Sequence, residues 1–504
     1  MLSLRDIFLF NPDKPLIFTQ LYFWIFYAVV LIVFSFIYKR QALRNVFLFA
    51  ASLFFYWKTS GLFFLLLIFS TVSDYYLGNL IYYSGKKAWK KAGMIASIVI
   101  NLFLLSYFKY TYLFVDTINS LFHLNIEVMN YLAEWSNAVT GTHFDINVIL
   151  LPVGISFYTF QTISYTVDLY RRKVEPVKNL LDFGFYVSFF PQLVAGPIVR
   201  ASEFVPQIYK RYHLTKEEFG YAIYLIMKGL FKKILIGDFI AVNFIDRIFA
   251  NPLGYTGFEN LMALYGYSLQ VYVDFSGYTD IATGVALLLG FRLPRNFNSP
   301  YKATNVGNFW KRWHISLSTW LKDYLYIPLG GNRKGKVRTD INLMITMLLG
   351  GLWHGASWQF VIWGGMNGVG LVIYKMWRKI SPYEHSKHWA VRLWKIFLTF
   401  NFITFTRIWF RSDSMKHAGD LIHQVVHTFQ ATTIPSVVWN YRWVFLVMAI
   451  GYFTHWVSNR WKYGLQNWYI KRPLWQQIII AAGLVFIIYQ SWSSDLQPFI
   501  YFQF

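Results

Sequence analysis

The chain of 504 residues contains no cysteine and few charged residues. The absence of cysteine excludes disulfides, thiolate metal sites and a cysteine nucleophile from this chain. Only 14% of its residues are charged and 56% are hydrophobic, whereas about a quarter of a soluble protein is charged. The sequence also lacks a glycine-rich phosphate loop and a Gly-x-Ser-x-Gly elbow, so we expect no serine nucleophile of that type.

Long apolar runs are what the sequence has instead. Leu16–Tyr38 carries no formal charge, and the run from Gly61 to Ser84 contains only Asp74. Because a bilayer core needs roughly 20 apolar helical residues, the sequence predicts an all-α polytopic membrane protein with about ten to thirteen transmembrane or re-entrant helices. The first run is too long for a signal peptide, and we expect it to remain as a helix. Further segments at membrane depth are expected at 183–199, 219–249, 260–291, 341–374, 389–410, 434–457 and 475–492.

The net charge of +23 comes from basic loops between these runs. Lys and Arg cluster at 39–44, 86–91 and 171–173, whereas residues 110–170 contain neither. The positive-inside rule places the basic loops in the cytoplasm, the N-terminus outside, and an extracytoplasmic loop within 110–170. Basic loops of this kind contact anionic lipid headgroups, so we expect membrane lipids and no nucleic acid as partners.

We interpret residues 1–504 as a single integral-membrane domain, since no stretch between runs is long enough for a soluble domain. We divide it into N-terminal helices (1–146), a core (147–374) and C-terminal helices (375–504). Proline and glycine interrupt the core at 151–154 and 190–197. Broken helices at membrane depth need surrounding protein or a water-filled cavity. We therefore expect a cavity or a re-entrant segment there.

His354 lies near the middle of an uncharged stretch, Ile341–Tyr374. An ionisable group at membrane depth indicates function by default. A continuous helix over this stretch would be roughly 50 Å long, more than the bilayer core. We therefore expect Gly350, Gly351 and Gly355 to break or kink the helix at the imidazole and to leave room for a substrate. The alternative is a packed core histidine with both ring nitrogens satisfied.

His314 lies in a segment whose apolar residues recur every three or four positions, from Asn308 to Tyr326. This spacing predicts an amphipathic helix at the membrane interface, with His314 on its apolar side. The preceding Lys311 and Arg312 could meet a phosphate or a carboxylate. A packing role for His314 is the alternative.

Asp274 and Asp280 stand six residues apart in an apolar segment and point to different faces of a helix, so they do not form a catalytic pair. We expect them to bond to loop backbone or to Arg292 and Arg295. Gln270 shares a face with Asp274.

Asp420, His423 and His427 have the spacing of metal ligands on a helix. However, Gln424 stands where zinc hydrolases of that pattern carry an acid. We expect a solvated helix here and no metal cofactor.

A set of motifs resembles the membrane-bound O-acyltransferase superfamily, and within it the AlgI-like alginate and polysaccharide O-acetyltransferases. The resemblance extends over nearly the whole chain. The motifs are Pro152–Phe157, Phe190–Gln192 with Gly196–Pro197, Tyr267–Asp280, Phe291–Pro294, Asn296–Tyr301, Phe309–Ser318, Asp323–Gly331, Leu352–Gly355 and Phe499–Phe504.

The resemblance implies a ring of helices around a thinned, funnel-shaped centre. It implies that His354 is the catalytic histidine and that His314, 40 residues earlier, is the second histidine of the site. His354 would act as a general base and His314 would orient the acceptor or stabilise an oxyanion. As substrate-binding residues we predict Trp353, Lys311, Arg312, Asn308, Asp323 and Gln270.

For function, the resemblance implies a multi-pass O-acyltransferase of the bacterial inner (plasma) membrane. It would pass an acetyl group from acetyl-CoA, or from an acyl carrier protein, across the membrane to an exported polysaccharide such as alginate. A separate extracytoplasmic partner of the SGNH type is implied as well. Three alternatives remain: D-alanyl transfer to teichoic acid, a channel or transporter with a gating histidine, and a scaffold for export machinery.

Overall fold

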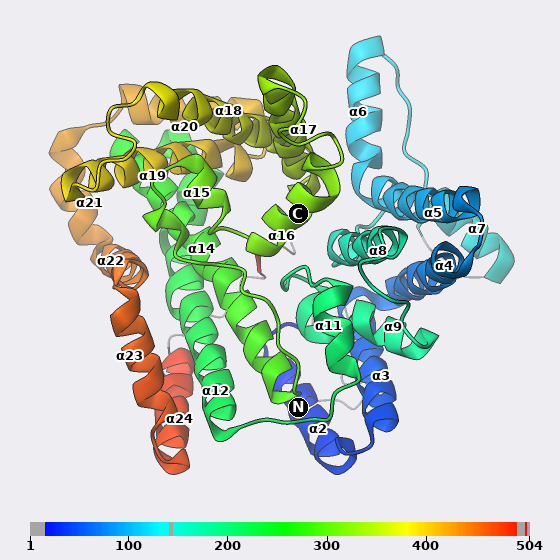
Figure 1. The fold of residues 1–504 in the computed structure, drawn as a ribbon. Coiled ribbons are helices and arrows are strands. Elements are labelled where there is room, and N and C mark those ends of the chain that lie inside the picture. The colour runs from blue at the N-terminus through cyan, green and yellow to red at the C-terminus, as the bar shows by residue number, and fades with distance from the viewer. Residues whose placement is uncertain (1–15, 141–144, 491–498, 501–504) are drawn as a thin grey trace.

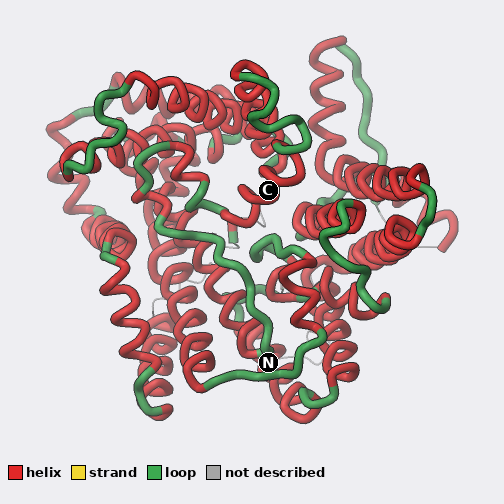
Figure 2. The backbone as a smooth tube through the Cα atoms, in the orientation of Figure 1, coloured by secondary structure: helices red, strands yellow, loops and turns green. Residues whose placement is uncertain are grey.

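A computed structural model describes residues 16–140, 145–490, 499 and 500. All regular structure in these ranges is helical, which confirms the predicted class (Figure 2). Residues 501–504 of the last motif, and residues 491 and 492 of the last predicted segment, lie outside the described ranges.

The helices vary in length from three residues to 32. The α-helices are α2 (Leu21–Ile37), α3 (Gln41–Ser60), α4 (Phe64–Tyr83), α5 (Lys87–Leu105), α6 (Thr111–Phe122), α7 (Tyr131–Thr140), α8 (Ile155–Tyr170), α9 (Leu180–Ser188), α10 (Phe190–Leu193), α11 (Ala201–Ile208), α12 (Lys216–Leu230), α13 (Asp246–Ala250), α14 (Gly257–Leu288), α15 (Val306–Trp310), α16 (Ile315–Leu321), α17 (Lys336–His354), α18 (Trp358–Ile380), α19 (Trp389–Arg411), α20 (Met415–His427), α21 (Ile434–Asn440), α22 (Arg442–Trp456), α23 (Asn459–Ile470) and α24 (Leu474–Gln490). Single 3₁₀ turns occupy η1 (Gly61–Phe63), η5 (Pro252–Gly254), η6 (Pro300–Lys302) and η8 (Ala431–Thr433), and π-helical turns occupy η2 (Ser106–Tyr110), η3 (Phe231–Asp238), η4 (Ala241–Ile245) and η7 (Lys322–Tyr326).

The chain forms two groups of helices with a central set between them (Figure 1). The early helices α3–α9 lie on one side, and α21–α24 lie on the other. Between them, α12 packs along α14, and α17 packs along α18. The segment that carries both candidate histidines therefore lies between the two outer groups.

Among the residues that the structure describes, two helical stretches are long and apolar enough to cross a membrane, namely Gln41–Tyr83 and Lys87–Phe122. Two bent pairs pass the same test together: Ala431–Asn440 with Arg442–Trp456, bent by 87°, and Asn459–Ile470 with Leu474–Ile488, bent by 117°. Leu21–Ile37 is a shorter apolar helix. The predicted number of ten to thirteen membrane elements stays a prediction.

Several predicted segments correspond to single helices, and others are divided. The segments 260–291 and 389–410 appear as α14 and α19, and 219–249 is helical from α12 through to α13 with two π-helical turns. Segment 183–199 is instead divided between α9 and α10 and is buried throughout. It is part of the protein core and has no lipid-facing side.

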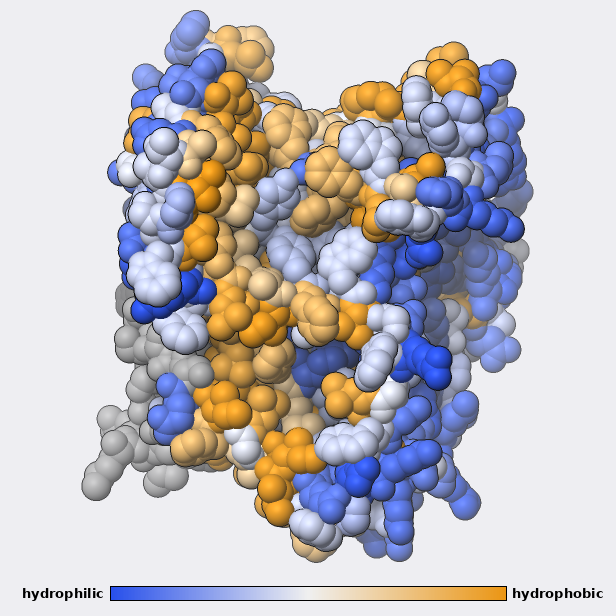
Figure 3. Space-filling model, turned by 90° about the vertical axis from the view of Figure 1, so that its left-hand side faces the viewer, coloured by the Kyte–Doolittle hydropathy of each residue, from blue (hydrophilic) through white to orange (hydrophobic). Residues whose placement is uncertain are grey.

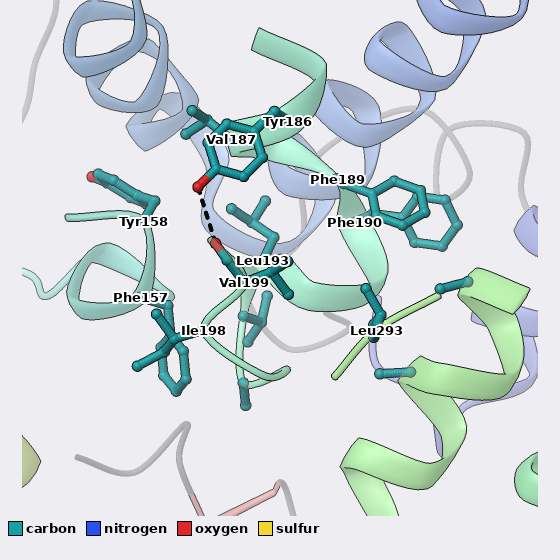
Figure 4. Close-up of a cluster of buried hydrophobic side chains, with 14 of the residues drawn as sticks. Phe157, Tyr158, Tyr186, Val187, Phe189, Phe190, Leu193, Ile198, Val199 and Leu293 are labelled. Atoms are coloured by element: carbon teal, nitrogen blue, oxygen red, sulfur yellow. Dashed lines mark hydrogen bonds between the residues drawn. The ribbon is translucent and has the colours of Figure 1, made fainter. Parts of the chain in front are cut away.

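The predicted breaks at 151–154 and 190–197 are present, but protein fills them (Figure 4). Gly154 has φ of 78°, and a Cβ there would lie 2.8 Å from the carbonyl oxygen of Leu193, so only glycine fits this turn. Leu193 and Val199 are fully buried, and the Tyr186 hydroxyl donates to the Val199 carbonyl at 2.9 Å. At these breaks the broken backbone is satisfied within a packed core and borders no cavity in the ranges that the structure describes. The alternative expectation, a re-entrant segment, stays a prediction.

Asp74, the acid inside the second apolar run, is buried between α4 and α5. Its carboxylate accepts hydrogen bonds from Ser97 at 2.6 Å and from Asn101 at 2.7 Å. A buried acid is tolerated when it is hydrogen-bonded in this way.

Large apolar side chains are exposed along α22 and α24, and the face on that side of the molecule shows a broad apolar band (Figure 3).

Candidate active site

His354 is the last residue of α17, and the chain breaks there before α18 begins at Trp358. The predicted helix break at the imidazole is therefore confirmed. The expectation that these glycines leave room for a substrate is wrong for Gly351 and Gly355. A Cβ on Gly351 would lie 2.3 Å from the Phe360 carbonyl oxygen and 3.0 Å from the Gly364 Cα, so this glycine allows α17 and α18 to touch. A Cβ on Gly355 would enter the Phe360 ring. The space beside these glycines is filled by α18 and is not open to a substrate.

Aromatic rings surround the His354 imidazole, which is only 4% exposed. The ring centroids of Trp353 and Trp363 each lie 5.1 Å from that of His354, and Phe410 lies at 5.5 Å. These rings come from α17, α18 and α19. They fix the orientation of the imidazole and exclude bulk water from it.

His314 lies at a sharp turn, which corrects the predicted amphipathic helix over 308–326. The helix is interrupted between α15 and α16, and His314 has φ of 43° in the left-handed region. The imidazole is turned away from water, as predicted; it is fully buried, and its ring lies 4.6 Å from that of Phe275 on α14. Non-glycine residues with positive φ are uncommon and cluster at functional sites.

The turn brings the two histidines together. The ring centroids of His314 and His354 lie 6.4 Å apart with an interplanar angle of 69°, and Trp353 lies 6.1 Å from His314. Two histidines that are 40 residues apart in sequence thus form one buried pair at the end of α17.

Asn296 sets the protonation pattern of His314. Its Oδ1 accepts from the Ser316 backbone N–H at 3.1 Å and from the Ser316 hydroxyl at 2.9 Å, and it lies 3.2 Å from His314 Nδ1. A backbone N–H only donates, so this atom must be the amide oxygen. Nδ1 therefore carries a proton that it donates to Asn296, and Nε2 is the acceptor nitrogen of the neutral ring.

Lys109 and Tyr110 hold the end of α17 from a distant part of the chain. The buried Lys109 ammonium donates to the carbonyls of Trp353 at 2.7 Å and His354 at 3.3 Å, and the Tyr110 hydroxyl donates to Leu352 at 3.0 Å. A cation at a helix C-terminus is favoured by the helix dipole. Sequence reasoning missed both residues. The signal was a lone lysine in an apolar run, with no other Lys or Arg between Lys91 and Arg171.

Arg407 is a second buried cation that sequence reasoning missed, and it is the one charge within residues 396–410. Its guanidinium lies 4.6 Å from the ring centroid of Trp313, the residue before His314, and 3.4 Å from the Tyr301 hydroxyl. It therefore packs against the turn that carries His314.

The structure separates the other predicted site residues. Lys311 is exposed, and Arg312 donates to Asn308 Oδ1 at 2.9 Å and to the Asn298 carbonyl at 3.1 Å. These three lie on the segment that leads into the His314 turn. Of the six predicted substrate-binding residues, Trp353 has ring contacts with both histidines.

Asp323 and Gln270 occupy different surroundings. The Asp323 carboxylate accepts from Arg200 at 2.7 Å, and its backbone carbonyl accepts from Arg171. Gln270 lies on α14, about 7.5 Å along the helix axis from Phe275, which contacts His314. Their substrate-binding roles stay predictions.

The acids of α14 pair with lysines, which corrects the expectation of Arg292 and Arg295. Asp274 accepts from Lys233 at 2.5 Å and, as expected of loop backbone, from the Ile500 N–H at 2.9 Å. Asp280 pairs with Lys228 at 3.0 Å and Lys232 at 2.6 Å. Within the described ranges, no group of three His, Asp or Glu side chains is placed to bind a metal.

Comparison with known proteins gives the class of this fold and site. The model of the MBOAT, membrane-bound O-acyltransferase family matches residues 53–412. The chain belongs to this family and is an O-acyltransferase.

Three curated relatives illustrate its similarity. The chain is 40% identical to a probable alginate O-acetylase AlgI of Pseudomonas syringae pv. tomato over 75% of this chain and 69% of the relative. It is 35% identical to a peptidoglycan O-acetyltransferase of Helicobacter pylori over 77% of this chain and 75% of the relative. A teichoic acid D-alanyltransferase of Bacillus subtilis is 32% identical over 53% of this chain and 70% of the relative.

Proposed function

We propose that this protein transfers an acetyl group from a cytoplasmic thioester donor, acetyl-CoA or an acyl carrier protein, for O-acetylation of an exported polysaccharide such as alginate. The observation that carries the proposal is the buried pair of His314 and His354 at the break between α17 and α18. The names of the relatives, an alginate O-acetylase and a peptidoglycan O-acetyltransferase, support a polysaccharide as the final acceptor.

In the proposed mechanism His354 acts as the general base. The acceptor hydroxyl gives its proton to a ring nitrogen of His354 while its oxygen forms a bond to the thioester carbonyl carbon. The carbon–sulfur bond then breaks, and the thiolate leaves with the proton that His354 returns. Positioned proton transfer of this kind contributes about 10²–10⁴-fold to the rate.

His314 positions the acceptor. Because Nδ1–H donates to Asn296, the neutral ring offers Nε2 as a hydrogen-bond acceptor. An acceptor atom binds a hydroxyl group and does not stabilise an oxyanion, which needs a donor. Of the two roles predicted from the sequence, the geometry supports orientation of the acceptor hydroxyl.

A separate extracytoplasmic partner of the SGNH type fits the composition of this chain, which lacks cysteine and a serine elbow. The partner would carry the acyl group to the polysaccharide at the outer face of the inner membrane. The basic loops at 39–44, 86–91 and 171–173 would lie on the donor side.

The experiment is acetyl transfer from radiolabelled acetyl-CoA by the purified chain with its co-expressed partner. We expect His354→Ala to lose transfer by at least about 10²-fold, whereas His423→Ala, which alters an exposed histidine on α20, keeps it. Parent-like transfer by His354→Ala contradicts the assignment. No transfer by the parent from acetyl-CoA or from an acetylated carrier protein contradicts the acetyl donor.

The second candidate is D-alanyl transfer to teichoic acid, which the similarity to the Bacillus subtilis relative favours. That similarity covers a smaller share of this chain than the similarity to the O-acetylases. Transfer of labelled D-alanine from a charged carrier protein, measured beside acetyl transfer, separates the two. Family membership favours an enzyme over a channel, a transporter or a scaffold.

A further inference from the structure

A large cavity lies apart from the buried rings of the histidine pair, between α12, α14, the loop 292–299, α22 and α23. Its volume is about 1270 Å³, above the range of about 300–1,000 Å³ that is typical of small-molecule sites. Helices α22 and α23 lie beyond residue 412, where the family match ends. The cavity therefore combines the family core with a part of the chain outside that match.

The walls of this cavity carry a surplus of positive charge. Five cationic side chains face two carboxylates, and these charged lining residues are Lys228, Lys232, Arg292, Arg295, Lys462, Glu218 and Asp280. Lys228 and Lys232 share the single Asp280, and Arg292 pairs with Glu218. Arg295 donates to the Phe297 carbonyl and to the Asn298 side-chain oxygen. Lys462 donates to the Ser299 hydroxyl and to the His455 carbonyl. None of these four acceptors carries a charge. A wall of this composition attracts an anion.

Three buried side chains in the lining, those of Thr279, His455 and Asn296, have polar atoms without a hydrogen-bond partner in the described part of the chain, and the last two are the most deeply buried. His455, which is 2% exposed, has neither ring nitrogen bonded, and Asn296, which is 1% exposed, has its Nδ2 unbonded. Buried polar atoms are normally satisfied, so each such atom needs an explanation. A ligand with oxygen atoms in the cavity supplies partners for His455 and Asn296.

The rim of the cavity is apolar and exposed. Phe453 is 71% exposed, Trp461 is 76% exposed and Leu465 is 59% exposed, and all three line the cavity from α22 and α23. Both helices belong to the bent pairs that pass as membrane segments. On the side of the molecule that carries them, hydrophilic residues are visible in a hollow that apolar side chains surround (Figure 3). Exposed apolar side chains on a membrane segment face lipid.

The charged end of the cavity lies on the cytoplasmic side. Arg44, in the first turn of α3, belongs to the basic cluster 39–44 that the positive-inside rule places in the cytoplasm, and it donates to the carbonyls of Ile208 and Lys210. Gln207, next to them, donates to the Arg292 carbonyl at the cavity. Anionic lipids concentrate in the cytoplasmic leaflet, and basic pockets between helices on that side bind their headgroups.

We propose that this cavity binds an anionic phospholipid, with the phosphate between Arg295, Lys462 and the lysines of α12 and η3, and with acyl chains over Phe453, Trp461 and Leu465. The headgroup oxygens reach His455 and Asn296. Asn296 Oδ1 also accepts the hydrogen bond of His314 Nδ1–H, so the occupant lies one side chain away from the histidine pair. The proposal does not depend on which acyl group or acceptor the enzyme uses.

The test is binding of radiolabelled dioleoylphosphatidylglycerol to the purified full chain in detergent micelles, compared with dioleoylphosphatidylcholine. Loss of one charge-assisted bond to phosphate weakens binding by about tenfold. We expect that loss for phosphatidylglycerol in Arg295→Met and in Lys462→Met, and retained affinity in Arg295→Lys. Lys91→Met, which removes the same charge from an exposed side chain on α5, is the matched control.

His455→Phe tests the buried end, because phenylalanine keeps the ring contacts with Tyr272 and Tyr301 and removes both nitrogens. We expect weaker phosphatidylglycerol binding with an unchanged melting temperature. Equal binding of the two lipids by the parent, or parent-like affinity in both Met variants of the cavity, overturns the proposal. Displacement of the lipid by coenzyme A overturns it as well, because the cavity would then belong to a soluble phosphate-bearing molecule.

Discussion

Gly351→Ala tests whether the contact between α17 and α18 positions His354. Gly351 lies one helical turn before His354 and faces Gly364 of α18. A Cβ at residue 351 would lie 2.3 Å from the Phe360 carbonyl oxygen, whereas an ordinary contact begins at 3.4 Å. Because backbone atoms of α18 cannot rotate away as a side chain can, the two helices must separate by about 1 Å.

A separation of about 1 Å at this point moves the His354 ring relative to the rings of Trp363 and Phe410, which come from α18 and α19. Misplacement by about 1 Å costs on the order of 10²-fold in rate when a reaction depends on positioned groups. We therefore expect Gly351→Ala to lose acetyl transfer by about 10²-fold. Alanine has a higher helix propensity than glycine by about 1 kcal/mol. The expected loss of activity would therefore not come from unfolding of α17.

Gly350→Ala is the matched control, because it makes the same change one residue earlier. Its Cβ would meet only Leu321 Cδ1, at 3.2 Å, which is the end of a flexible side chain. The assay is labelled acetyl transfer per mole of folded protein, with folding checked by the melting temperature in detergent. We expect Gly350→Ala to stay within about threefold of the parent. Equal activities of the two variants would refute the reasoning.

Three further predictions concern buried polar groups. Lys109→Met should lower transfer by about tenfold, because two carbonyls at the end of α17 lose a cationic donor. Tyr110→Phe should have a smaller effect, because it removes one neutral hydrogen bond. Equal transfer by the two variants contradicts the role of Lys109 as a cap of α17. Lys233→Met should destabilise the fold by about 3–5 kcal/mol, because it leaves Asp274 buried without its cation. Thermal unfolding measures this loss. Adding Asp274→Asn to the variant should restore part of the stability. Ser316→Ala should lower kcat several-fold without raising the donor KM, because it loosens Asn296 beside His314; a raised KM alone contradicts this.

The sequence predicted the helical class and the importance of His354 for physical reasons, whereas the site role of His314 was implied by the resemblance to the family. Uncharged runs of spanning length have few structural alternatives, and an isolated imidazole within such a run marks a site. The long segment 260–291 was predictable as a helix and appears as α14. The break at His354 was predictable from helix length together with the glycines on either side of the histidine.

The details that failed depend on tertiary contacts. The periodic spacing over 308–326 favours a continuous helix, but the backbone turns at His314, where Asn296 and Ser316 supply hydrogen bonds from outside the helix. Gly351 and Gly355 near His354 looked like space for a substrate, and they are instead the surface against which α18 packs. Lys109 could be noticed in the sequence, but its partner 245 residues away could not.

The central claim is that His314 and His354 work as one unit on a single acceptor group. A double-mutant cycle of acetyl transfer with His314→Ala, His354→Ala and the double variant tests it most directly. If the two rings act together, the double variant loses no more activity than His354→Ala alone. If the losses of the single variants multiply in the double variant, the two histidines act independently and the account is contradicted.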